Sequence, residues 1–332
     1  MTSPRIAVLG TGALGGYYGG LLARAGHHVH FVARSDHDHI ARHGLRVDSV
    51  AGDFLLEDVA VHGSTTTVPS CDIVLVCVKT FHNPSAIPAV SRLLQPGGTV
   101  VLLQNGLGEE EAIAALPGVG RVVSALGFVC ATKLGPGHIR HSDYGSLRLA
   151  QYADDRQPAG LTQELERIAQ LFETAGVKAS TEEDWLAARW RKLVWNVPFN
   201  GLSVAQRADT HQLVSHEPTR QVVRELMLEV VAAARAEARV IDPAFVDRMI
   251  DDTTRMRPYL PSMRIDFDEG RPLELDAMYR VPIERGRAAG VAMPHAAMLF
   301  AQLDYLVGAR DGQRPAVTQK PSRKEPGPVS QP

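Results

Sequence analysis

The feature that most constrains this chain is a glycine-rich turn near its N-terminus, GTGALG at Gly10–Gly15. The turn directly follows an apolar run at Arg5–Leu9 and leads into a helical pattern at Leu14–Ala25, and a second apolar run follows at His28–Ala33. In such a turn the glycines permit a tight bend, a close approach of the backbone to a pyrophosphate, and close packing of helix on strand. The free N–H groups of the helix N-terminus favour phosphate. We therefore predict a dinucleotide-binding strand–helix–strand unit.

The residue after the second apolar run bears on which dinucleotide binds. NAD sites usually place Asp or Glu there, because a carboxylate binds the ribose hydroxyls. This chain has Arg34 instead, and a guanidinium pairs with a 2′-phosphate, so the sequence favours NADP(H). Asp36 follows closely, so a solvated surface arginine is the alternative.

Histidines are concentrated in the same region. Six of the 13 lie between His27 and His43. They lack a recognised ligand spacing, so we expect a solvated, mildly basic rim near the cofactor rather than a metal site.

Two regions of the chain differ in their hydrophobic pattern. Through residue 182, short apolar runs alternate with helical stretches, which indicates a parallel sheet covered by helices. The strands expected after the first two are 72–78, 99–103 (after a turn at Pro96–Gly98), 121–129, 138–141, 146–150 and 177–180, with a helix at 161–175. We predict an α/β Rossmann-type doubly wound domain over 1–182.

Long helical patterns dominate the rest of the chain. They cover Glu183–Asn196, Thr219–Ala238, Pro243–Met256, Glu274–Ala289 and Pro294–Val307, and the spacing of Ser180 and Glu183 suggests a capping box at their start. We predict an all-α C-terminal domain over 183–307. Residues 308–332 are rich in Pro, Gly and charge, so we expect a disordered tail there.

Composition narrows the class of protein. With 35 Lys and Arg against 37 Asp and Glu, the net charge of −2 gives no broad footprint for nucleic acid. No apolar run reaches the ~20 residues that a membrane span needs, and the N-terminus does not resemble a signal peptide. Three cysteines, Cys71, Cys77 and Cys130, are too few for a disulfide framework. We expect a cytoplasmic protein with a small-molecule partner and neither a nucleic-acid nor a membrane partner. A homodimer is compatible with the sequence, which does not fix the oligomeric state.

Polar residues interrupt an apolar helical segment at 185–202. Lys192 and Asn196 are four residues apart and share a helix face, and Asn200 extends the row if the helix passes Pro198, which should bend or end it. These side chains form either the floor of a site between the domains, or a solvent-reaching lysine with asparagines that cap the helix end. The residues alone leave both open.

A second polar set, Ser262 and Glu274, lies farther on. Glu274 begins a helical pattern, where a carboxylate is also favoured electrostatically, so a catalytic role and a capping role are equally good here.

Five ordered motifs resemble the ketopantoate reductase (2-dehydropantoate 2-reductase) family. They are GTGALG at Gly10–Gly15, VKT at Val78–Thr80, QNGLG at Gln104–Gly108, WRKLVWN at Trp190–Asn196, and Ser262-Met with Glu274-Leu-Asp eleven residues after Met263. The resemblance extends from Arg5 to about Leu306. It implies an oxidoreductase of pantothenate biosynthesis that uses NADPH to reduce a 2-keto acid, 2-dehydropantoate to pantoate, in a cleft between a Rossmann domain and a helical domain.

The resemblance also implies roles for single residues. Lys192 matches the family's general acid, and an ordinary lysine of pKa about 10.4 is protonated at neutral pH, so no lowered pKa is required. Glu274 matches an essential glutamate that orients this lysine and contacts the substrate. The implied substrate-binding residues are Asn105, Asn196, Asn200 and Ser262. The implied cofactor-binding residues are Gly10, Thr11, Gly12, Ala13, Leu14, Gly15, Arg34, Lys79, Asn105 and Ala131.

Several positions depart from the family pattern and are expected to line or back the substrate side. They are Gly201 after Asn200, Ile265 before Asp266, Tyr279 and Arg280 after the Glu274 motif, and Pro282. They leave open the alternative of a D-2-hydroxyacid dehydrogenase that takes a different 2-keto acid. A second alternative, a non-catalytic NADPH-binding protein, is disfavoured by the intact pair Lys192 and Glu274.

Overall fold

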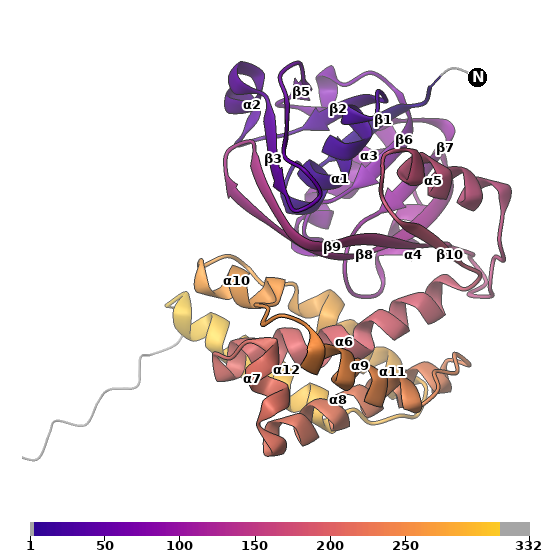
Figure 1. Ribbon diagram of the computed structural model, residues 1–332. Helices are drawn as coiled ribbons and strands as arrows, with labels where there is room; N and C mark the ends of the chain where they lie inside the picture. Colours follow the sequence, from indigo (N-terminus) through magenta and orange to yellow (C-terminus); the bar gives the residue numbers. More distant parts are fainter. Residues whose placement is uncertain (1–2, 313–332) are drawn as a thin grey trace, which may run out of the picture.

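The fold, seen in a computed structural model that describes residues 3–312, combines an α/β part with a helical part. Figure 1 shows the α/β part above and the helices from α6 onward below, with β8 and β9 along the boundary between them. This arrangement confirms the predicted fold class of a Rossmann-type part followed by a helical part.

The described residues form one ten-stranded sheet, in the order β4-β3-β9-β8-β7-β6-β1-β2-β5 with β10 paired to β9. The strands are β1 (Arg5–Leu9), β2 (His28–Val32), β3 (Leu45–Ser49), β4 (Phe54–Leu56), β5 (Ala60–His62), β6 (Cys71–Val76), β7 (Leu94–Leu102), β8 (Val119–Gly135), β9 (His138–Gln151) and β10 (Ala179–Glu182). From β5 through β8 all neighbours are parallel, and β8 then pairs antiparallel with β9. The carboxyl ends of the parallel strands therefore share one edge, where doubly wound sheets bind ligands.

Helices accompany the sheet and form the second part. The first group is α1 (Ala13–Arg24), α2 (His37–His43), the 3₁₀ turns Thr65–Thr67 and Thr80–His82, α3 (Asn83–Leu93), α4 (Glu109–Ala114) and α5 (Gln163–Thr174). The second is α6 (Trp185–Gln206), α7 (Thr210–Ser215), α8 (Glu217–Ala236), α9 (Ala244–Arg255), α10 (Ser262–Asp268), a π-helical turn at Asp276–Arg280, α11 (Val281–Ala288) and α12 (Pro294–Arg310). No helix within residues 3–312 is both long and apolar enough to cross a bilayer.

Several of the strand limits expected from the sequence were wrong. The turn predicted at Pro96–Gly98 lies inside β7, where the pairing register with β8 shifts between Gly98 and Thr99. The strands expected over 121–129, 138–141 and 146–150 belong to the two long strands β8 and β9. Strands β3 to β5 were not predicted, because they are only three to five residues long and such short runs carry little hydrophobic pattern.

Helix α6, which carries Lys192, also differs from expectation. The predicted capping box is wrong because Ser180 lies in β10, and Asp184 caps α6 instead by accepting hydrogen bonds from the N–H groups of Leu186 and Ala187. The helix does not end at Pro198 but continues to Gln206. Burial of nearly all of its last two turns outweighs the hydrogen bond that proline removes.

The helical core joins the two parts of the molecule. Its buried cluster includes Leu107, Leu126 and Ala150 from the α/β part. At the chain's end, α12 reaches Arg310, so residues 308–310 are helical rather than part of the expected tail. The rest of that expected tail, from residue 313, lies outside the described residues.

Candidate active site

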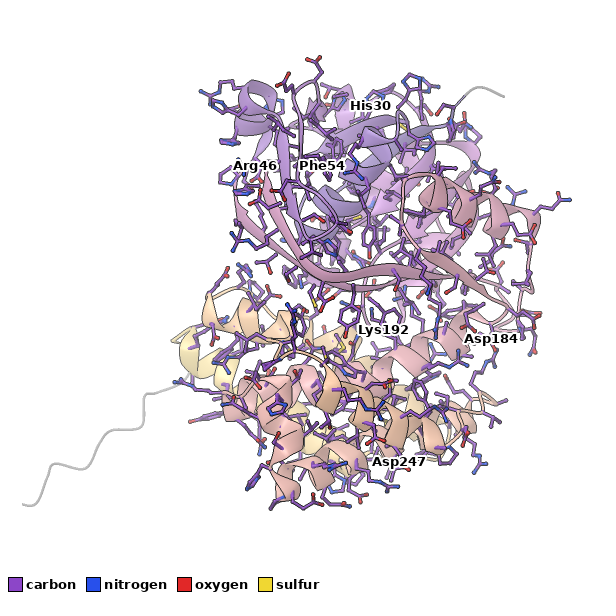
Figure 2. The ribbon with its side chains drawn as sticks, in the orientation of Figure 1. His30, Arg46, Phe54, Asp184, Lys192 and Asp247 are labelled. Carbon is purple, nitrogen blue, oxygen red and sulfur yellow. The ribbon has the colours of Figure 1, made fainter. Side chains whose placement is uncertain are left out.

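A cavity of about 860 Å³ lies between the two parts of the molecule and brings the predicted site residues together. Residues from the glycine-rich turn, the ends of β2 and β6, and α6, α9 and α10 line it. Every residue that the sequence assigned to the site lines this cavity except Gly15. In Figure 2, Lys192 lies where the two parts meet.

The three glycines of the turn have different surroundings. Gly10 has φ +100°, and a Cβ there would lie 2.7 Å from the Val78 side chain. A Cβ at Gly15 would lie 2.1 Å from the Gly10 carbonyl oxygen, so Gly15 serves packing and not ligand contact. A Cβ at Gly12 would meet nothing within 4 Å. The open space at Gly12, at the N-terminus of α1, fits a pyrophosphate.

Arg34 lies exposed at the end of β2 and lines the cavity. Asp36 could have formed an ion pair with Arg34. It is instead buried and accepts hydrogen bonds from Lys133 Nζ at 2.7 Å and from the Gly137 N–H at 3.1 Å. Burial alone would raise the pKa of Asp36, but these hydrogen bonds outweigh it and lower the pKa. Within residues 3–312 no ion pair involves Arg34, so its guanidinium is available to an anion.

Lys192 projects from α6 into the cavity. Its ammonium donates a hydrogen bond to the Gly127 carbonyl oxygen and lies 4.6 Å from the centre of the Phe128 ring. Burial, with the nearby charges of Arg189 and Arg148, lowers the pKa of Lys192 to about 7. The sequence analysis did not require this lowered pKa and could not foresee it, because the sequence does not show how deeply the helix places this group.

Glu274 is bonded to a different lysine from the one expected. Its carboxylate accepts hydrogen bonds from Lys79 Nζ at 3.1 Å and from the Thr80 N–H at 3.0 Å. Lys79 Nζ also donates to Asp266 at 2.9 Å. Burial would lower the pKa of Lys79, but the Glu274 and Asp266 carboxylates outweigh it and raise the pKa. The expected orientation of Lys192 by Glu274 is therefore replaced by a bridge between the two parts of the molecule.

Asp266 does not line the cavity but bonds to Lys79, which does, and the sequence analysis did not assign it. Its carboxylate bonds to Lys79 and, at 2.8 Å, to Arg271 Nε. The available signal was its place four residues after Ser262 on α10, one helical turn along the same face.

The two asparagines of α6, Asn196 and Asn200, differ in the hydrogen bonds that their side chains form. Asn200 is buried; its Nδ2 donates to the Asn196 carbonyl oxygen at 3.1 Å, and its Oδ1 accepts from the Met263 N–H at 3.2 Å. It therefore fixes the start of α10, and with it Ser262, against α6. Asn196, Asn105 and Ser262 line the cavity.

The departures from the family pattern were expected to line or back the substrate side, and the structure excludes the first of these positions. The cavity lining includes neither Gly201, Ile265, Tyr279, Arg280 nor Pro282. Gly201 and Tyr279 compensate for each other, since a Cβ at Gly201 would lie 2.4 Å from Tyr279 Oη. That hydroxyl donates to the Val197 carbonyl oxygen at 2.7 Å. Arg280 is exposed and bonds to Asp276 and Glu284 on its own helical segment.

A buried ion pair joins the two parts beside the cavity, and sequence analysis missed it. Arg189 Nε donates to Glu110 Oε1 at 2.5 Å, and the two side chains are 2% and 0% exposed. The Arg189 guanidinium also donates to the carbonyl oxygen of Gln104, next to Asn105. An arginine on an amphipathic helix and a glutamate in a run of three resemble surface residues, so only the fold reveals the pair.

The histidine-rich region holds a contact between His30 Nδ1 and His62 Nε2, at 3.1 Å. Among residues 3–312 no group of three or more His, Cys, Asp or Glu side chains is arranged to hold a metal ion.

Comparison with known proteins agrees with this geometry. Residues 6–154 match the family model described as ketopantoate reductase PanE/ApbA, and residues 184–306 match the model for the C-terminal part of the same family. A 2-dehydropantoate 2-reductase from a Nostoc species is 42% identical over 94% of this chain and 98% of its own. The crystal structure of a 2-dehydropantoate 2-reductase from Geobacter metallireducens has a TM-score of 0.87 at 40% identity, covering 91% of this chain and 99% of its own. That of the Methylococcus capsulatus enzyme has a TM-score of 0.83 at 34% identity, covering 92% and 97%.

Proposed function

The chain belongs to the ketopantoate reductase family and is an oxidoreductase, and we propose that it reduces 2-dehydropantoate to pantoate with NADPH, with Lys192 as the proton donor. The observation that carries this proposal is that one and the same cavity is lined by the glycine-rich turn, Arg34 and Lys192. Because the chain belongs to a family of enzymes, the alternative of a non-catalytic NADPH-binding protein is disfavoured.

The residues on the α/β side are suited to hold the cofactor. Gly12 and the N-terminus of α1 offer open space and free N–H groups to a pyrophosphate, and Arg34 offers its guanidinium to a 2′-phosphate. Lys79, Asn105 and Ala131 line the same side of the cavity and complete the proposed binding surface. NADPH, when bound, supplies the hydride to the carbonyl carbon of the substrate.

Lys192 is suited to complete the reduction. Negative charge develops on the carbonyl oxygen, where an ammonium stabilises it and then transfers a proton to form the hydroxyl. A pKa near 7 places this acid close to neutral pH, where transfer is most efficient. The carboxylate of a bound 2-keto acid favours the charged ammonium, so substrate binding should help to protonate Lys192.

The remaining site residues are proposed to orient the substrate. Asn105, Asn196 and Ser262 offer amide and hydroxyl groups along the cavity, while Asn200 holds α6 and α10 in place. Glu274 lines the cavity, so we keep it as a catalytic candidate that contacts the substrate and positions Lys79 rather than Lys192. A homodimer and a cytoplasmic location remain predictions.

The proposal is tested by following NADPH oxidation with purified protein and 2-dehydropantoate, and by identifying the product as pantoate. We expect turnover with NADPH to exceed that with NADH. A protein that binds NADPH but reduces neither 2-dehydropantoate nor any other 2-keto acid would contradict the proposal.

A further inference from the structure

The buried pair of Glu110 and Arg189 contacts backbone and side chains that lead to the active-site candidates. Arg189 Nε donates to Glu110 Oε1 at 2.5 Å, and the same guanidinium donates to the Gln104 carbonyl oxygen. Glu110 Oε1 accepts a second hydrogen bond from Ser124 Oγ on β8, at 2.5 Å. The pair therefore ties α6 to the segment that follows β7 and to β8.

The segment that carries Asn105 is held by the helical part on both sides. Arg189 binds the carbonyl oxygen of Gln104, the residue before Asn105. Two residues after Asn105, the Leu107 N–H donates to the Ala277 carbonyl oxygen at 3.0 Å. Asn105 itself lines the cavity. Its position relative to α6 therefore depends on the Arg189 contact.

The same pair borders the surroundings of Lys192. Lys192 follows Arg189 by three residues on α6, so the two side chains emerge about one turn apart on the same side of the helix. The Lys192 ammonium donates to the Gly127 carbonyl oxygen, and Gly127 lies three residues after Ser124 on β8. The pair thus connects the helix that carries Lys192 with the strand that accepts its hydrogen bond.

Stability alone does not account for this pair. The Arg189 and Glu110 side chains are 2% and 0% exposed. Among residues 3–312, Glu110 Oε2 and Arg189 Nη2 are buried and have no hydrogen-bond partner. Burying two charges with unpaired polar atoms costs free energy that apolar side chains of similar volume would not cost. What the pair adds is the geometry that it imposes on its neighbours.

We propose that Glu110 and Arg189 are positioning residues for the reduction, which hold Asn105 and Lys192 at a fixed separation so that the substrate's carbonyl group meets both. The inference rests on the proposed function, in which Lys192 donates the proton and Asn105 binds the substrate. Neither residue of the pair lines the cavity, so both act through other groups. A misplacement of about 1 Å at a reacting group lowers a rate by about 10²-fold.

The charge of Arg189 provides a second readout. Burial, with the charges of Arg189 and Arg148, lowers the pKa of Lys192 to about 7. The other charged groups on the elements around the cavity are Arg191 on α6, Glu182 on β10, Asp252 on α9, and the bonded pair Lys79 and Glu274. Removing the Arg189 charge should raise the pKa of Lys192. Removing the Glu110 charge leaves Arg189 uncompensated and should lower that pKa.

The test measures kcat, KM and the pH at which kcat/KM falls, with NADPH and 2-dehydropantoate. Arg189→Met removes the contact with Gln104, and Glu110→Gln removes the partner charge but keeps an acceptor. The double variant Glu110→Gln, Arg189→Met removes both charges. Arg189→Lys keeps the charge but lacks the planar guanidinium that reaches two acceptors. Thermal denaturation of each variant sets an assay temperature at which all are folded.

Arg285→Met is the matched control, because Arg285 also joins the helical part to α4. Its guanidinium bonds to Glu111 at 3.4 Å and to Glu237 at 2.9 Å, and Arg285 does not line the cavity. This variant breaks a link from the same short helix but leaves the contacts of Gln104 and Lys192 in place.

Arg189→Met should lower kcat at least about tenfold, and Glu110→Gln should lower it less, while Arg285→Met stays within about threefold of the wild type. The falling limb should move to higher pH in Arg189→Met, move to lower pH in Glu110→Gln, and stay in place in Arg189→Lys and Arg285→Met. The double variant should be more stable to heat than Glu110→Gln but remain as slow as Arg189→Met, because methionine cannot hold the Gln104 carbonyl.

Two results would overturn the positioning role but leave the proposed function standing. One is a double variant with the kcat of the wild type. The other is an Arg189→Met protein whose kcat and falling limb match those of Arg285→Met. If the single variants do not fold, the kcat of the double variant decides in the same way. A wild type that reduces no 2-keto acid would instead overturn the proposed function, and the positioning role with it.

Discussion

Lys79 Nζ lies 3.1 Å from Glu274 Oε2, and this bond crosses from the α/β part to the helical part at the cavity. The bond separates the roles of two lysines that line one site. Lys79 is held in its charged form by Glu274 and Asp266, whereas burial and neighbouring arginines lower the pKa of Lys192 to about 7. One lysine is thus suited to a constant positive charge and the other to proton transfer.

Replacing Lys192 by alanine should remove the proton donor. We expect kcat to fall by about 10²–10⁴-fold, the usual contribution of a positioned general acid, while the Kd for NADPH changes by less than about threefold. Steady-state kinetics and fluorescence titration with NADPH measure the two effects, and Lys178→Ala, at an exposed lysine, is the control. Equal losses in turnover and in cofactor affinity would show that Lys192 binds the cofactor instead.

The rate should depend on pH through Lys192. The protonated ammonium is the active form, so kcat/KM for reduction should be highest below pH of about 7 and fall as pH rises through that value. In Lys192→Arg the charge persists to much higher pH, so this descending limb should disappear even if the rate is low. A limb that remains at the same pH in this variant would assign it to another group.

Cofactor preference should depend on Arg34. Arg34→Asp replaces a phosphate-binding cation by a carboxylate that repels the 2′-phosphate and can bind ribose hydroxyls. We expect the ratio of kcat/KM for NADPH to that for NADH to fall at least about tenfold. Arg42→Asp makes the same charge change at an exposed α2 residue outside the cavity lining and should leave the ratio nearly constant.

The Glu110–Arg189 pair should matter for stability. Glu110→Gln leaves the buried Arg189 charge without its partner, so the free energy of unfolding should fall by about 3 kcal/mol. Urea denaturation measures this loss. Asp247→Asn, which breaks an exposed ion pair with Arg224, should cost less than about 1 kcal/mol. The double variant Glu110→Gln, Arg189→Met should recover part of the loss, and no recovery would contradict the pairing argument.

Gly201 and Tyr279 should be coupled. Gly201→Ala introduces a Cβ 2.4 Å from Tyr279 Oη and should destabilise the protein by about 1–3 kcal/mol. In the Tyr279→Phe background the clashing hydroxyl is absent, so the same substitution should cost less. Thermal denaturation of the four proteins gives the coupling energy, and additive effects would show that the two positions act independently.

Much of the site could be predicted because its signals are local. Three of these signals depend only on residues close in sequence. They are the glycine-rich turn, the arginine at position 34 in place of a carboxylate, and the helical spacing of Lys192 and Asn196. Local geometry fixes these features wherever the chain is placed. The motif resemblance added Glu274 and Ser262, although their partners were still unknown.

The sequence by itself determined the strand–helix–strand unit, the helical second half and the placement of Arg34, Lys192 and Asn196 in candidate sites. Only the tertiary structure decided which partners they take: Glu274 bonds to Lys79, and Asp36 bonds to Lys133 instead of competing for Arg34. It also decided that α6 continues past Pro198 and that the pKa of Lys192 lies near 7. The physical reason is the same in each case. Burial and charge at these atoms come from segments distant in sequence, and their effect exists only once the two parts of the molecule are packed together.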